Sequence, residues 1–125
     1  MEYEILYRPS YSLLKMKLAK GEAMVAEAGA MVSMSSTVGI QTEMKGGLFG
    51  ALKRSVLGGE SFFMNTFTAS DAGEITFAPP LPGDIAGIEL KNQTVYVQSR
   101  AYLASTPNIQ VDTKWGGAKT FFSKE

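Results

Sequence analysis

The chain has 125 residues, with 12 basic and 12 acidic side chains, so its formal net charge is zero. It contains no cysteine and no histidine, which excludes disulfides, thiol chemistry, zinc–thiolate sites and a Ser-His-Asp triad. The balanced charge gives no strong signal for nucleic-acid binding, and the 45% apolar content is enough for the core of one domain.

The first third of the chain alternates apolar and polar residues over short stretches, which is typical of half-buried strands. Strands are expected at 3–7, 12–18, 23–26, 30–34 and 38–44. The clearest is the last, where Val38, Ile40, Thr42 and Met44 share one face.

A helix is predicted at 48–57, between two glycine pairs. Leu48, Phe49, Leu52 and Val56 fall within an arc of about 100°, which favours contact with a core or another subunit. The spacing of the glycines and lysine does not fit a phosphate-binding loop. A peripheral membrane contact, with two basic side chains near lipid phosphates, is the less favoured alternative. These basic residues are Lys53 and Arg54.

Further strands are expected at 61–68, 74–78, 85–90, 95–98, 101–104 and 109–113. Strands that recur every 8 to 12 residues or so are typical of a sandwich or barrel. The sequence therefore predicts an all-β fold, an antiparallel sandwich with one short helix. The expected core residues are Ile40, Phe63, Phe67, Ile75, Phe77, Val97 and Ile109.

An internal repeat is suggested by two similar stretches, 29–47 and 100–117, each ending in a glycine pair. The chain is then a single domain, 1–125, with repeat units at about 1–85 and 86–125. The second unit stops soon after Phe121-Phe122 and is predicted to be incomplete. An unpaired edge would expose backbone donors and acceptors, so a second subunit or further chain is expected to cover it.

Candidate site residues are few, because the acidic residues are dispersed and form no acid–base pair on one element. The single tryptophan, Trp115, could anchor a partner, although packing beneath Gly116-Gly117 is favoured. No catalytic, metal or cofactor site is predicted. The candidate partner or subunit contacts are Leu48, Phe49, Leu52, Lys53, Arg54 and Trp115.

Four segments in order resemble the altered-inheritance-of-mitochondria family: GAMVSMSS (29–36), GGESFFMNTFTA (58–69), APPLPGDI (78–85) and AYLASTP (101–107). The resemblance covers essentially the whole chain. It implies a β-sandwich similar to the tryptophan RNA-binding attenuation protein, built from repeated β units. It also implies a link to mitochondrial biogenesis in fungal members, and it supplies no catalytic residues.

The expected function is that of an uncharacterised, non-enzymatic scaffold or interaction protein that forms a homo-oligomer. The alternative is a module that binds a small ligand or nucleic acid, which rests on fold similarity alone. The early glutamates and the lack of an apolar leader give no indication of a secretory signal, so a cytoplasmic location is expected.

Overall fold

The computed structural model describes residues 1–44, 63–98, 100–112, 114–116 and 119–121. This part of the chain contains strands and no helix, which confirms the all-β prediction. The strands are β1 (Glu2–Leu6), β2 (Leu13–Leu18), β3 (Ala23–Glu27), β4 (Met31–Met34), β5 (Val38–Met44), β6 (Phe63–Ala69), β7 (Gly73–Phe77), β8 (Ala104–Ser105), β9 (Lys114–Gly116) and β10 (Lys119–Phe121).

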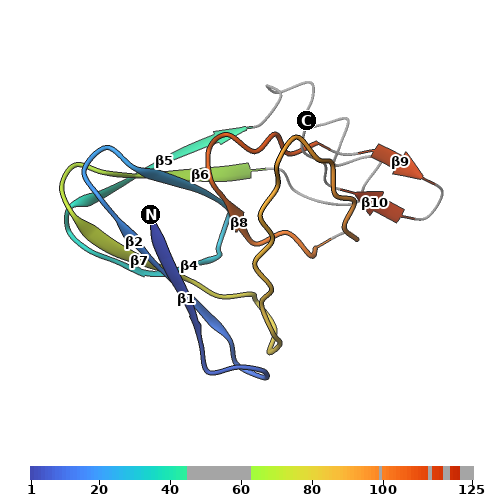
Figure 1. The fold of residues 1–125 in the computed structure, drawn as a ribbon, viewed down its shortest axis with the longest axis horizontal. Helices are drawn as coiled ribbons and strands as arrows, with labels where there is room; N and C mark the ends of the chain where they lie inside the picture. The colour runs from blue at the N-terminus through green and yellow to red at the C-terminus, as the bar shows by residue number, and fades with distance from the viewer. Residues whose placement is uncertain (45–62, 99, 113, 117–118, 122–125) are drawn as a thin grey trace.

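Two four-stranded antiparallel sheets pack face to face (Figure 1). The first has the order β1-β2-β7-β4 and the second the order β5-β6-β3-β8. A tight turn at 35–37 joins β4 to β5 and closes one side of the sandwich. The strands at the other ends of the sheets, β1 and β8, flank the opposite side, which is therefore open.

Alternation along the strands builds the core, because every second side chain points between the sheets. Phe67 of β6 and Phe77 of β7 are fully buried and join the two sheets. Their rings lie 5.5 Å apart at 70°, an edge-to-face arrangement that aromatic pairs favour. Together with buried Ile75, they confirm three of the predicted core positions.

The prediction that Ile40 and Phe63 are buried was wrong. Ile40 is 49% exposed and Phe63 is 43% exposed. Ile40 lies on β5, the outermost strand of its sheet, and Phe63 is the first residue of β6, so each has packing neighbours on fewer sides. Val97 and Ile109, also expected in the core, are only partly buried.

A second, smaller cluster covers the outer face of the second sheet. Val25 and Met64 point to this face and are buried against Val111. The partly buried side chains around them come from Val97, Tyr102 and Ile109. The later part of the chain therefore wraps around the β3–β8 edge and packs on both faces of the sheet.

The prediction of strands at 85–90, 95–98 and 109–113 was wrong, because the described residues in these ranges form no regular strand. Of the strand expected at 101–104, only its end is regular, in β8. Alternating side chains are not enough, because a strand also needs a hydrogen-bonded neighbour. The predicted helix at 48–57 lies outside the described residues, and the internal repeat remains a prediction.

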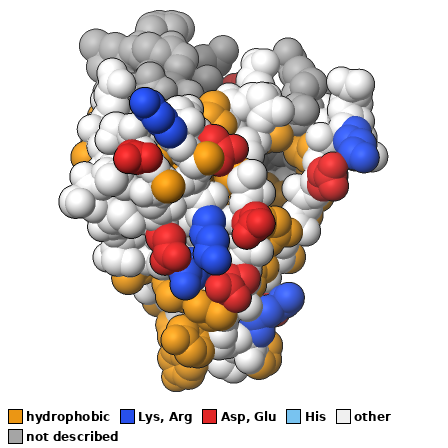
Figure 2. Space-filling view, turned by 60° about the vertical axis from the view of Figure 1, so that its left-hand side comes forward, with side chains coloured by type: hydrophobic (Ala, Val, Ile, Leu, Met, Phe, Trp, Pro, Cys, Tyr) orange, Lys and Arg blue, Asp and Glu red, His pale blue; other side chains and the backbone are white. Residues whose placement is uncertain are grey.

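The outer face of the first sheet carries interspersed charges (Figure 2). Glu4 of β1 is opposite Lys15 of β2, and the lysine Nζ lies 4.0 Å from the Glu4 carboxylate and 3.5 Å from that of Glu74. Glu2 and Lys17 are likewise opposite each other. These pairs explain the alternation of β2: its apolar residues face the core and its lysines face solvent.

Candidate functional site

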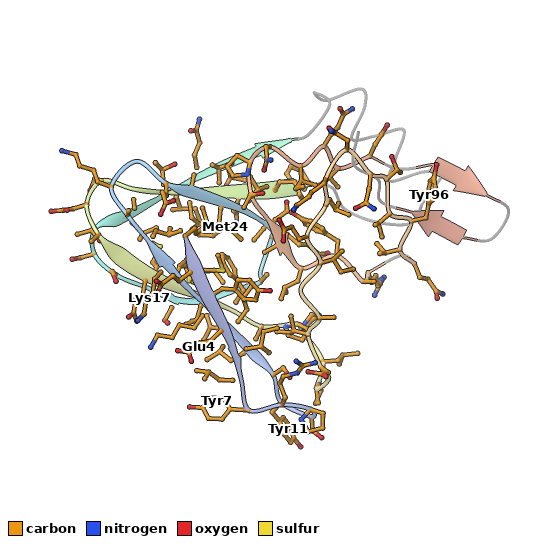
Figure 3. The ribbon with its side chains drawn as sticks, viewed as in Figure 1. Glu4, Tyr7, Tyr11, Lys17, Met24 and Tyr96 are labelled. Atoms are coloured by element: carbon orange, nitrogen blue, oxygen red, sulfur yellow. The ribbon has the colours of Figure 1, made fainter. Side chains whose placement is uncertain are left out.

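A groove of about 680 Å³ lies on the open side of the sandwich; it is called the open-side groove below. One wall is formed by Tyr3 and Ile5 of β1 with Leu14 and Met16 of β2. Met24 of β3 lies within the sandwich behind it (Figure 3). The facing wall is formed by described residues between Asp84 and Val111, so residues far apart in sequence form one cavity.

The facing wall is mainly apolar. Its apolar side chains include Ile85, Ile88, Leu90, Val95, Val97, Leu103, Ile109 and Val111. Polar side chains also line the groove, among them Glu27, Asp84, Glu89, Arg100 and Tyr102. Such a surface suits an apolar occupant oriented by a few polar groups.

Asp84 fixes the start of the facing wall to the β1–β2 hairpin. Its carboxylate accepts hydrogen bonds from Arg8 Nε at 2.9 Å, Arg8 Nη2 at 3.0 Å and Ser12 Oγ at 2.7 Å. The backbone N–H of Ile85 donates a fourth, at 2.8 Å. Donors of this kind stabilise the ionised carboxylate, so the pKa of Asp84 lies well below its usual range, mainly because of Arg8.

Tyr102 fixes the other end of the wall to β3. Its hydroxyl donates to the Val25 carbonyl at 3.2 Å and lies 2.8 Å from Ser105 Oγ. The Glu27 N–H donates to the Leu103 carbonyl at 3.1 Å, beside the β3–β8 ladder. Burial raises the pKa of Tyr102 to about 12, so the phenol is neutral at physiological pH.

Between these two anchors, residues 86–90 of the wall have an unpaired backbone. In the described part of the chain, the backbone groups of Ala86 to Leu90 make no hydrogen bond. Ile88, at the centre of this stretch, is 64% exposed. On the inner side, Gly87 is packed so closely that an added Cβ would collide with Tyr3 Oη.

The Asp84 carboxylate at the groove serves as an anchor for the wall. Asp84 is held ionised by Arg8, so it is a poor general acid near neutral pH. Across the residues that the structure describes, no group of three or more acidic side chains could hold a metal ion. The same residues include no helix long and apolar enough to cross a membrane.

The side chains of the predicted contact residues all lie outside what the structure describes. Trp115 lies on β9, opposite Thr120 of β10, and its side chain is outside the description. Leu48, Phe49, Leu52, Lys53 and Arg54 also lie outside the described residues.

Sequence reasoning did not identify the two anchors. Arg8 and Asp84 are 76 residues apart, and Tyr102 is 77 residues from Val25. Asp84 is one of the dispersed acidic residues, and no local sequence pattern distinguishes it. Both anchors arise from the path of the chain around the sheets, which alternation and turn spacing do not specify.

The sequence profile of the family described as Mitochondrial biogenesis AIM24 matches residues 3–125. An uncharacterised protein of Streptococcus pyogenes serotype M6 is 28% identical over 116 residues, which cover 88% of this chain and 47% of that protein. The crystal structure of a Streptococcus pyogenes protein superposes with a TM-score of 0.78 at 26% identity, over 99% of this chain and 60% of the other. The chain thus spans about half the length of the curated relative.

Proposed function

Since the chain belongs to the Mitochondrial biogenesis AIM24 family, with an uncharacterised protein as its curated relative, we propose a function from the geometry: a non-enzymatic interaction module that assembles with further copies of itself. The observation that carries this proposal is the open-side groove, whose outer wall combines apolar side chains with an unpaired stretch of backbone. Exposed backbone and exposed apolar side chains together favour association with another polypeptide.

The charge distribution also supports self-association. The formal net charge is zero, so two copies approach without overall electrostatic repulsion. The outer face of the first sheet pairs its charges locally, through Lys15 with Glu4 and Glu74. The groove side presents the apolar side chains of Ile88 and Leu90, beside the ion pair between Lys91 and Glu89.

A second candidate function is binding of a small apolar ligand, which the groove volume favours. The volume of about 680 Å³ lies within the range of roughly 300–1,000 Å³ found for small-molecule sites. Polar groups such as Arg100 and Glu27 could orient such a ligand at the groove.

Native mass spectrometry of protein purified from cells separates the two functions, since it reports subunit number and retained mass together. An interaction module is expected to give dimers or larger assemblies with the mass of the polypeptide alone. A monomer that carries an additional small mass would contradict self-assembly and support ligand binding. A bare monomer at every concentration would contradict both.

A further inference from the structure

We propose that residues 86–90 form an edge strand that pairs, antiparallel and two-fold symmetric about Ile88, with the same residues of a second copy of this chain. The inference rests on the proposed function, because it requires that the chain self-associates. To that function the inference adds the residues that form the interface and the register in which they pair.

The first observation is the state of the backbone. Ala86 to Leu90 are five consecutive residues whose N–H and C=O groups make no hydrogen bond in the described structure. The alternation of 85–90 predicts a strand, and Figure 1 shows this part of the chain beside the sandwich, drawn as coil. A free edge of this kind is a template for pairing with another chain.

The second observation is the pattern of side chains. Ala86, Ile88 and Leu90 alternate with Gly87 and Glu89. Gly87 lies against Tyr3, so its side of the segment faces the first sheet. Once the segment is paired as a strand, every second residue lies on the same side, which sets Ile88 on the side opposite Gly87. Ile88 is 64% exposed and is available for such a contact.

The third observation is that the segment is complementary to itself in charge. Antiparallel pairing about Ile88 sets each Ile88 against its copy and Ala86 against Leu90. Glu89 then lies opposite Gly87, and Lys91 opposite Ile85, so no like charges are directly opposed. The existing ion pair, with Lys91 Nζ 3.6 Å from the Glu89 carboxylate, neutralises the remaining charge at each end.

Two other sheet edges are less suited to pairing. Free β1 carries Glu2 and Glu4, and charged side chains discourage edge-to-edge contact. The ladder of β4 shifts register between Met31 and Ser33, and a bulge disrupts further pairing. Val32 on β4 is 58% exposed and supplies a matched control.

A charge-swap experiment tests the register. Ile88→Lys and Ile88→Glu each set two like charges opposite one another across the two-fold axis and remove two apolar contacts. Each variant is expected to weaken self-association by about tenfold or more in sedimentation velocity, since it loses the burial of an isoleucine and opposes like charges. An equimolar mixture of the two is expected to restore the dimer, because lysine then faces glutamate. Val32→Lys is expected to associate as the wild type does.

Each contrary outcome is informative. If wild-type protein associates and Ile88→Lys associates equally well, the interface proposed here is wrong, while the proposed function stands. If both variants dissociate and their mixture does not re-associate, the register about Ile88 is wrong. If the wild type itself never associates, the proposed function fails first. Circular dichroism of each variant, compared with the wild type, shows that the fold is retained.

Discussion

Arg8 and Asp84, 76 residues apart in sequence, form a two-pronged ion pair with N–O distances of 2.9 and 3.0 Å. The pair joins the turn between β1 and β2 to the first residue of the long segment that forms the outer wall of the open-side groove. Buried Ser12 donates to the same carboxylate, which adds a third fixed contact from the hairpin. The position of the groove wall thus depends on a polar anchor that lies outside the apolar core.

Replacing the Asp84 carboxylate should make the free energy of unfolding depend less on pH in the acid range. Because the folded pKa of Asp84 is depressed, its stabilising effect is present above the unfolded pKa, near 4, and is lost as pH falls through the folded pKa. Asp84→Asn is therefore expected to be less stable than wild type at pH 7, with the difference shrinking at pH 3 and below. Urea unfolding followed by circular dichroism measures this. A difference that is constant across pH would contradict the ionic role.

Tyr102 should give the opposite pH dependence, at the alkaline end. Its folded pKa of about 12 is higher than the ordinary value of 10.0, so the unfolded chain loses the phenol proton first. The stability that the neutral phenol contributes is present below pH 10 and is lost as pH rises from about 10 towards 12. Tyr102→Phe is expected to cost about 0.5–1.5 kcal/mol at pH 7, from lost hydrogen bonds. The difference in the free energy of unfolding between wild type and Tyr102→Phe should narrow above pH 10. A difference that widens would contradict burial of the hydroxyl.

The two phenylalanines of β6 should differ sharply when truncated. Phe67 is fully buried against Phe77, so Phe67→Ala is expected to reduce the free energy of unfolding by about 3–5 kcal/mol. Phe63 is 43% exposed, and Phe63→Ala is expected to cost clearly less. Chemical denaturation of both variants makes the comparison. Equal losses would show that Phe63 is as deeply packed as Phe67.

Two glycines provide a matched test of close packing. A Cβ at Gly73 of β7 would collide with Thr37 Oγ1 in the turn that joins the two sheets, whereas a Cβ at Gly83 would meet nothing within 4 Å. Gly73→Ala is expected to lower stability by about 1–3 kcal/mol and Gly83→Ala by less than about 0.5 kcal/mol. Thermal unfolding of the two variants compares their melting temperatures. Equal melting temperatures would contradict the prediction and show that the turn adjusts to the added methyl group.

Alternation predicted the first half of the fold well, because those strands find antiparallel neighbours in the same chain. The strand predicted at 38–44 is β5, with the same boundaries. The same reasoning was wrong for 85–90. Its side chains alternate as in a strand, but the backbone of 86–90 makes no hydrogen bond in the described structure. Periodicity reports which face of a segment is apolar, and pairing depends on what lies beside it.

Burial was harder to predict than strand position. Met64 is buried on the outer face of the second sheet, because the later segment wraps over that face and brings Val111 against it. Ile40 points to the core side yet lies on an outermost strand and remains half exposed. The groove was also not predicted, since long-range contacts such as Arg8–Asp84 and Tyr102–Val25 bring its walls together.

Hydrogen exchange of the wild-type chain at increasing protein concentration tests the central claim most directly. If residues 86–90 pair with a second copy, their backbone amides exchange quickly in dilute solution and become protected as concentration rises. The amides of β2, which is already paired on both sides, should show no such change. Rapid exchange of 86–90 at every concentration, in a sample that sedimentation shows to be associated, would contradict the claim.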